Sequence, residues 1–152
     1  MAATTLLLAV GNVLRGDDGV AARALELLGG AADVEARAVH GLTPELAEAV
    51  AGAGRVVILD ADLGASGVMV EALPEADLRG HGAGRVLSHS LTPTALVALA
   101  RQLYGFAGPA WICRLPVQDL AAGVGLSAVA EAAAREGARQ LAALLESLEV
   151  IS

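Results

Sequence analysis

Two acidic residues and one histidine follow apolar segments of strand length, and their side chains could do chemistry. They are Asp18, which follows Asp17 on a glycine-rich stretch, Asp60 and His89. In an open α/β sheet the carboxyl ends of the parallel strands meet at one edge, so residues that follow the strands can converge there. Two carboxylates and an imidazole form a mixed oxygen and nitrogen ligand set that suits a divalent transition metal with open coordination positions. The sequence therefore predicts a metal site of Asp18, Asp60 and His89.

Each of these residues also has a purely structural interpretation. Asp is a favoured helix N-cap and stabilises the positive end of a helix, so Asp17 or Asp18 could cap the helix that follows. Asp60 could cap the turn after its strand, and His89 could hydrogen-bond a loop. Three such residues at equivalent positions after strands make a shared site more plausible than three separate structural roles.

Apolar segments of strand length alternate with amphipathic segments of helical period. The expected strands are Thr4 to Val10, Val34 to Val39, Arg55 to Leu59, Val68 to Leu73, Arg85 to Leu87 and Ala110 to Leu115. The expected helices are Ala21 to Leu28, Pro44 to Val50, Pro93 to Leu103 and a long C-terminal helix that Ser127 caps. The pattern predicts one domain over residues 1–152, a three-layer α/β/α sandwich with a mainly parallel, mixed central sheet of about five to six strands.

The pattern His-x-Leu-Thr-Pro occurs twice, at His40 and at His89. In each copy we expect the threonine, Thr43 or Thr92, to be the helix N-cap, and the proline that follows to be the first helical residue. The two copies indicate a junction between a strand and a helix that the chain uses twice.

Composition excludes several classes of function. The formal net charge is −7, and all ten basic residues are arginines, which fits poorly with binding to nucleic-acid phosphates. No stretch of about 18 apolar residues occurs, so we expect no membrane association and a cytoplasmic protein. The single cysteine, Cys113, excludes an internal disulfide and lies in an apolar strand, where we expect an inert thiol.

The motifs of several other hydrolases and nucleotide-binding proteins are missing from the sequence. It has no His-Glu-x-x-His, no Gly-x-Ser-x-Gly and no phosphate-binding Walker loop, and the glycines at 11, 16 and 19 do not have the dinucleotide-binding spacing. A phosphoacceptor receiver domain would need a lysine, which this chain lacks.

Four motifs resemble, in order, those of the maturation endopeptidases of [NiFe] hydrogenases. The most specific is Gly11-Asn12-x-Leu14-x-x-Asp17-Asp18-Gly19-Val20. The others are the strand that ends in Asp60-Ala61, the segment Ser88-His89-Ser90-Leu91, and Gly125-Leu126-Ser127 before the last helix. The resemblance covers nearly the whole chain.

The resemblance implies an endopeptidase that removes a C-terminal extension from the precursor of a [NiFe] hydrogenase large subunit after nickel insertion. The nickel would arrive with this precursor, the partner, and Asp18, Asp60 and His89 would be both its ligands and the catalytic residues. Asp17 would then be the helix cap. We also expect a monomer with no nucleic-acid or membrane partner.

Three further hypotheses concern the same residues. His40 lies at a strand end of its own and could be a rival or additional ligand. A non-catalytic binding or chaperone relative, which recognises a metallated partner without cutting it, would need the same acids and histidine. A peptidyl-tRNA-hydrolase-like enzyme would share the Gly-Asn after the first strand, but the acidic charge argues against an RNA substrate.

Overall fold

The central element is a five-stranded sheet in the computed structural model, which describes residues 4–74, 91–120, 123 and 125–151. Its spatial order is β2-β1-β3-β5-β4, and only the edge strand β4 runs antiparallel to its neighbour. The strands are β1 (Thr4–Val10), β2 (Val34–Val39), β3 (Gly54–Asp62), β4 (Met69–Ala72) and β5 (Ala110–Pro116). The three-layer α/β/α sandwich with a mainly parallel, mixed sheet that the sequence predicts is confirmed. The expected strand Arg85 to Leu87 lies outside the described residues.

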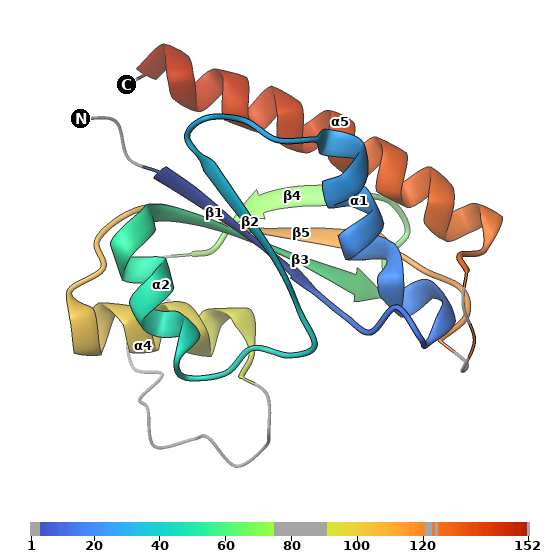
Figure 1. The fold of residues 1–152 in the computed structure, drawn as a ribbon, viewed down its shortest axis with the longest axis horizontal. Helices are drawn as coiled ribbons and strands as arrows, with labels where there is room; N and C mark the ends of the chain where they lie inside the picture. The colour runs from blue at the N-terminus through green and yellow to red at the C-terminus, as the bar shows by residue number, and fades with distance from the viewer. Residues whose placement is uncertain (1–3, 75–90, 121–122, 124, 152) are drawn as a thin grey trace.

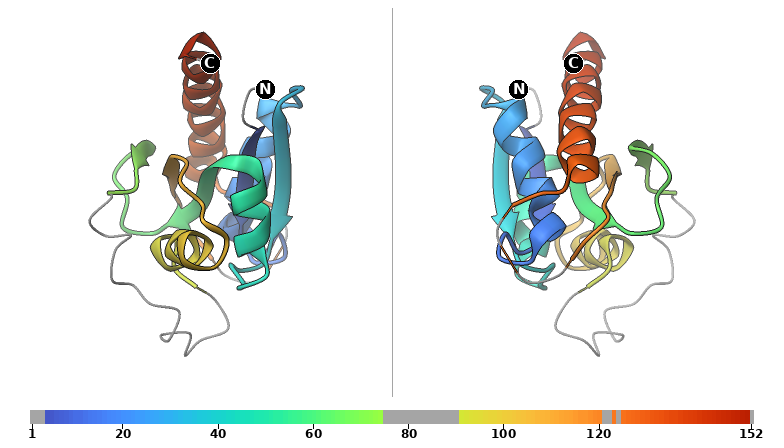
Figure 2. Two further views of the ribbon diagram at one scale, coloured as in Figure 1. Left: turned by 90° about the vertical axis from the view of Figure 1, so that its left-hand side faces the viewer. Right: turned by 90° about the vertical axis from the view of Figure 1, so that its right-hand side faces the viewer.

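Helices cover both faces of this sheet. Helices α1 and α5 pack together on one face, whereas α2 and α4 pack together on the other (Figures 1 and 2). Their bounds, with the short 3-10 helix that precedes α1, are η1 (Gly16–Gly19), α1 (Val20–Leu28), α2 (Leu46–Ala53), α4 (Pro93–Tyr104) and α5 (Ala128–Ile151). No helix among the described residues is both long enough and apolar enough to cross a membrane.

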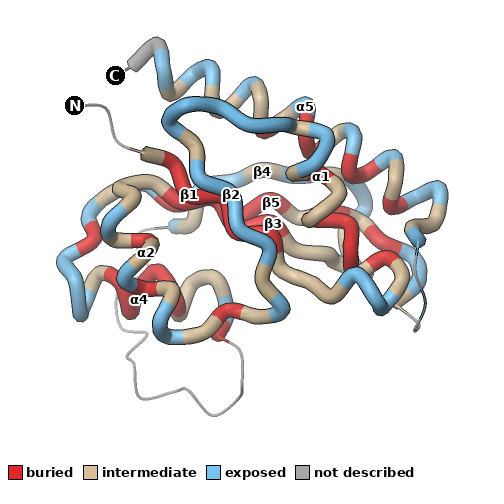
Figure 3. The backbone as a smooth tube through the Cα atoms, in the orientation of Figure 1, coloured by how far each residue is buried: buried red, intermediate tan, exposed pale blue. Residues whose placement is uncertain are grey.

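Strand β1 lies in the centre of the core, and its side chains alternate between the two helix layers. Leu6 and Leu8 pack with α2 and α4, while Leu7 and Ala9 pack with α1 and α5. All four are buried, so the near-continuous apolar run that predicted this strand reflects burial on both faces (Figure 3). In contrast, β2 is largely exposed along its length because it forms the opposite edge of the sheet.

Gly137 lets α5 approach the sheet closely. A Cβ atom at this position would lie 2.6 Å from Cδ2 of Leu115 on β5 and 3.9 Å from the Cβ of Ala24 on α1. The glycine therefore serves close packing between a helix and two neighbouring elements, despite its low helix propensity.

The two His-x-Leu-Thr-Pro junctions start their helices differently. Thr92 caps α4, because its hydroxyl oxygen accepts the N–H of Ala95 at 3.1 Å and Pro93 is the first helical residue. The equivalent expectation for Thr43 is wrong. There the chain forms a turn in which the backbone carbonyl of Thr43 accepts the N–H of Leu46 at 3.0 Å, so α2 begins three residues later without a side-chain cap.

Candidate functional site

The loop between β1 and α1 begins at Gly11 and brings Asp18 back against the end of β1. A Cβ atom on Gly11 would lie 1.9 Å from the backbone oxygen of Asp18, and the φ of Gly11 is +150°, so only glycine fits here. The carboxylate of Asp18 accepts the N–H of Asn12 at 2.7 Å, and the side-chain oxygen of Asn12 accepts the N–H of Leu14 at 2.9 Å. These contacts hold the Asp18 carboxylate at the carboxyl edge of the sheet.

Asp17 has a different role from its neighbour. It is 1% exposed, and its carboxylate accepts the N–H groups of Gln118 at 2.8 Å and Asp119 at 2.9 Å, together with the N–H and the hydroxyl of Ser127, each at 2.7 Å. Burial alone would raise the pKa of Asp17, but these four hydrogen bonds outweigh it and lower the pKa to about 2. A carboxylate has about four acceptor positions, so Asp17 has no capacity left for a ligand.

The expectation that Asp17 caps the helix that follows it, α1, is therefore wrong. Helix α1 has Gly19 at its N-cap and no side-chain cap. Asp17 instead binds Ser127, whose hydroxyl oxygen accepts the N–H of Ala130 and so caps α5, the helix that Ser127 was predicted to begin. This contact joins the first loop of the chain to the last, and no local pattern in the sequence could have indicated it.

Further backbone bonds join the same two loops. The N–H of Gly16 donates to the carbonyl of Gly123 at 2.8 Å, the N–H of Gly123 donates to the carbonyl of Leu14 at 2.8 Å, and the N–H of Asp17 donates to the carbonyl of Asp119 at 2.8 Å. The short helix that holds Asp18 is thus also fixed by the loop between β5 and α5.

Asp60 lies near the end of β3, the strand next to β1. The register pairs Ala9 with Leu59, so Asp60 extends the sheet edge beside the end of β1. Burial raises the pKa of Asp60 to about 6, and the negative charges of Asp18 and Asp62 act in the same direction. The structure thus places two of the predicted site residues, Asp18 and Asp60, close enough on one edge for their charges to interact. His89 lies outside the described residues.

Asp62 has a structural role at the same strand end, because its carboxylate accepts the N–H of Gly64 at 2.8 Å in the following turn. Cys113 is fully buried in β5, and burial raises the pKa of its thiol to about 12, which makes it unreactive at neutral pH. The expectation of an inert cysteine is confirmed.

Two cavities flank the loop that holds Asp18. The larger, of about 450 Å³, lies over α1 and α5, and its charged side chains include Arg23 and Glu131, which form an ion pair at 3.0 Å. The smaller, of about 190 Å³, is lined by Asp18 and by His40, which follows β2. The smaller cavity is thus lined by two potential metal ligands, Asp18 and His40, whereas Arg23 and Glu131 of the larger one already bind each other.

The described residues hold no group of three or more His, Cys, Asp or Glu side chains arranged to bind a metal. Asp18 and Asp60 are hard oxygen donors, and a nitrogen donor beside them would complete the mixed set expected from the sequence.

No protein-family model and no curated protein sequence matches this chain, but solved structures do. The hydrogenase maturating endopeptidase HybD from E. coli is 22% identical, with a TM-score of 0.65 over 95% of this chain and 93% of that one. The [NiFe] hydrogenase maturation protease HycI from Thermococcus kodakarensis is 20% identical, with a TM-score of 0.68 over 95% and 93%. A hydrogenase 2 maturation peptidase from a Thaumarchaeota archaeon is 24% identical, with a TM-score of 0.65 over 93% and 97%. The chain shares their fold, which confirms the resemblance seen in the motifs at the level of the fold.

Proposed function

We propose that this protein is a maturation endopeptidase that removes the C-terminal extension from the precursor of a [NiFe] hydrogenase large subunit. The observation that carries the proposal is the placement of Asp18, from the loop after β1, and Asp60, from the neighbouring strand β3, at one edge of a sheet with the fold of such endopeptidases. The motifs around both residues match those of the family in order. We expect it to act in the cytoplasm as a monomer.

The proposed recognition depends on nickel that the precursor brings. Asp18, Asp60 and His89 would supply two oxygens and one nitrogen to coordination positions on that nickel, and the scissile bond would thereby be held within reach. A precursor without nickel would lack this attachment. Cleavage would then be conditional on metal loading.

The two carboxylates have unequal chemistry in this proposal. The Asp18 carboxylate is held by the Asn12 N–H, which suits a fixed ligand. The pKa of Asp60 is raised to about 6 by burial, so this group can take up a proton near neutral pH.

The experiment is incubation with a nickel-loaded precursor of a [NiFe] hydrogenase large subunit, followed by intact-mass spectrometry. We expect the precursor to lose its C-terminal extension, and nickel-free precursor to stay intact. The variants Asp18→Asn, Asp60→Asn and His89→Gln should each lower kcat/KM at least ~100-fold, as loss of a positioned catalytic group does. Asp33→Asn removes an exposed carboxylate at the other end of β2 and should leave kcat/KM unchanged.

Two results would argue against the proposal. An unchanged precursor mass together with a stable complex would favour the non-catalytic binding relative. Normal cleavage by the variants at Asp18, Asp60 and His89 would keep the activity but reject the assigned residues.

A further inference from the structure

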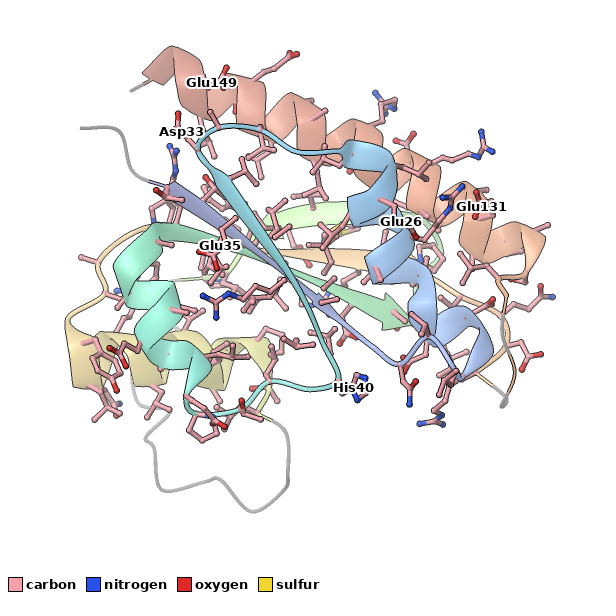
Figure 4. The ribbon with its side chains drawn as sticks, in the orientation of Figure 1. Glu26, Asp33, Glu35, His40, Glu131 and Glu149 are labelled. Carbon is pink, nitrogen blue, oxygen red and sulfur yellow. The ribbon has the colours of Figure 1, made fainter. Side chains whose placement is uncertain are left out.

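His40 and Asp18 face one small cavity at the carboxyl edge of the sheet, on the β2 side of Asp18. The cavity measures about 190 Å³, and its remaining lining is small or apolar: Ala9, Gly11, Val13, Ala22 and Ala38. His40 is exposed at the end of β2, on the side of the loop that leads into α1 (Figure 4). A carboxylate and an imidazole are thus the polar side chains of an otherwise apolar recess.

The backbone explains why these two side chains meet. Strands β1 and β2 stay in register to Val10 and Val39, and the N–H of Gly11 donates to the carbonyl of Val39 at 2.9 Å just beyond them. His40 therefore follows a fixed backbone position next to Gly11. Because Gly11 also contacts the backbone of Asp18, one residue links the two sides of the cavity.

The segment after His40 is fixed as well. Leu42 is 3% exposed in the core, and its carbonyl accepts the N–H of Leu91 at 2.8 Å. Leu42 and Leu91 are the equivalent leucines of the two His-x-Leu-Thr-Pro segments, so the two junctions bind each other directly. His40 consequently lies between two fixed positions, Val39 and Leu42, although its side chain is exposed.

A carboxylate oxygen beside an imidazole nitrogen suits a divalent ion such as Ni²⁺, Co²⁺ or Zn²⁺. Since a water molecule occupies about 30 Å³ in the liquid, the cavity has room for an ion with several of its waters. The nearby negative charge of Asp60, when ionised, favours a cation further. The described residues include no group of three potential metal ligands.

We propose that His40 is a further metal ligand of this protein. His40 and Asp18 would bind the ion from the β2 side of Asp18, whereas Asp60 lies on its β3 side. The inference rests on the proposed function in one respect: the ion that it would contact in the cell is the nickel of the precursor. His40 then supplies a second imidazole, from β2, to a metal that enters the edge with its own protein. Among the residues that the structure describes, two potential ligands, Asp18 and His40, line this cavity, so we expect free Ni²⁺ to bind weakly.

The test measures free Ni²⁺ binding to the intact protein by calorimetry, without any precursor. We expect His40→Gln and Asp18→Asn each to weaken binding at least ~10-fold, because loss of even an outer-shell partner costs 10- to 100-fold. Asp33→Asn lies at the opposite end of β2 and should change the affinity less than 2-fold (Figure 4). His40→Gln changes an exposed side chain, so unchanged circular dichroism should confirm its fold.

Imidazole nitrogen signals in ¹⁵N NMR supply the second measurement, with the His40 signals assigned by their loss in His40→Gln. We expect these signals to shift or broaden on addition of Ni²⁺. Wild-type affinity in His40→Gln, undisturbed His40 signals at saturating Ni²⁺, or no Ni²⁺ binding by the wild-type protein at millimolar concentration would each overturn the inference. Because no precursor is present, this result is independent of whether the protein cleaves one.

Discussion

Ser127 binds the carboxylate of Asp17 twice, through its backbone N–H and its hydroxyl, each at 2.7 Å. With the N–H groups of Gln118 and Asp119, this makes Asp17 the acceptor of four hydrogen bonds in a buried position. The residue beside the candidate metal ligand Asp18 is thus a structural group whose task is to hold the loop in place.

We expect Asp17→Asn to lower the free energy of unfolding by about 2 to 4 kcal/mol, because an amide oxygen cannot accept all four bonds and its NH₂ group would face other donors. Urea denaturation measures the change. Asp33→Asn, on the exposed stretch before β2, is the matched control and should change stability by less than about 0.5 kcal/mol. Equal stability of the Asp17 variant and the wild type would show that the four contacts contribute little.

The same carboxylate should make stability depend on acid pH. Its pKa is lowered from 3.8 to about 2 in the folded protein, so its contribution is complete above pH 4 and is lost as the pH falls towards 2. The loss amounts to about 2 kcal/mol at 1.36 kcal/mol per pKa unit. Urea midpoints measured from pH 6 to pH 2 should fall more steeply for the wild type than for Asp17→Asn, and parallel curves would contradict this.

Asp60 should act in the opposite direction. Its pKa is raised from 3.8 to about 6, so the folded state holds its proton more tightly, and stability falls as the pH rises from 4 to 6. We expect Asp60→Asn to remove this dependence. The stability of the variant minus that of the wild type should therefore rise by about 2 kcal/mol between pH 4 and pH 7. A stability difference that stays constant from pH 4 to pH 7 would show that the Asp60 carboxylate is not desolvated.

Replacing two helical glycines by alanine should change the free energy of unfolding in opposite directions. Gly137→Ala places a Cβ 2.6 Å from the buried Leu115, so we expect overpacking to cost about 1 to 2 kcal/mol despite the better helix propensity. Gly52→Ala in α2 meets nothing within 4 Å and should gain about 0.5 to 1 kcal/mol. Thermal unfolding of both variants tests the pair, and stabilisation by both would show that α5 can move away from β5 at little cost.

Gly11→Ala should disturb the site more than the core. The new Cβ would lie 1.9 Å from the backbone oxygen of Asp18, and an alanine is strained at a φ of +150°, so the loop that holds Asp18 must shift. We expect at least a ~10-fold loss of precursor cleavage and a loss of stability above about 1 kcal/mol. Gly67→Ala, which meets nothing within 4 Å, is the control with unchanged activity.

The elements predicted best from the sequence are those that local pattern and burial decide together. The apolar run of β1 gave its bounds without error, and Thr92 with Pro93 marked the start of α4. The same Thr-Pro pair failed at Thr43, because the backbone there closes a turn with its own carbonyl before the helix begins. A cap depends on the conformation of the residues before it, which the pair alone does not determine.

The site was predictable only in part for a related reason. Asp18 and Asp60 come together because parallel strands end at one edge, a rule that needs only the order of the strands. The partner of Asp17 depends on how a loop 110 residues further along the chain is folded back, and the cavity shared by Asp18 and His40 depends on the register of β1 with β2. The first leaves no signal in neighbouring residues, whereas the position of His40 after a strand of its own indicated the second in part.

The contact between Asp17 and Ser127 also has a consequence for the order in which the protein is made. A ribosome synthesises the β1 loop among the first residues, but the donors that fix it are added only after the whole sheet has been translated. Until then a buried carboxylate would have no partners, so the loop has no reason to adopt its final form. A nascent chain would therefore reach the final conformation of the loop that holds Asp18 only once the start of α5 has left the ribosome.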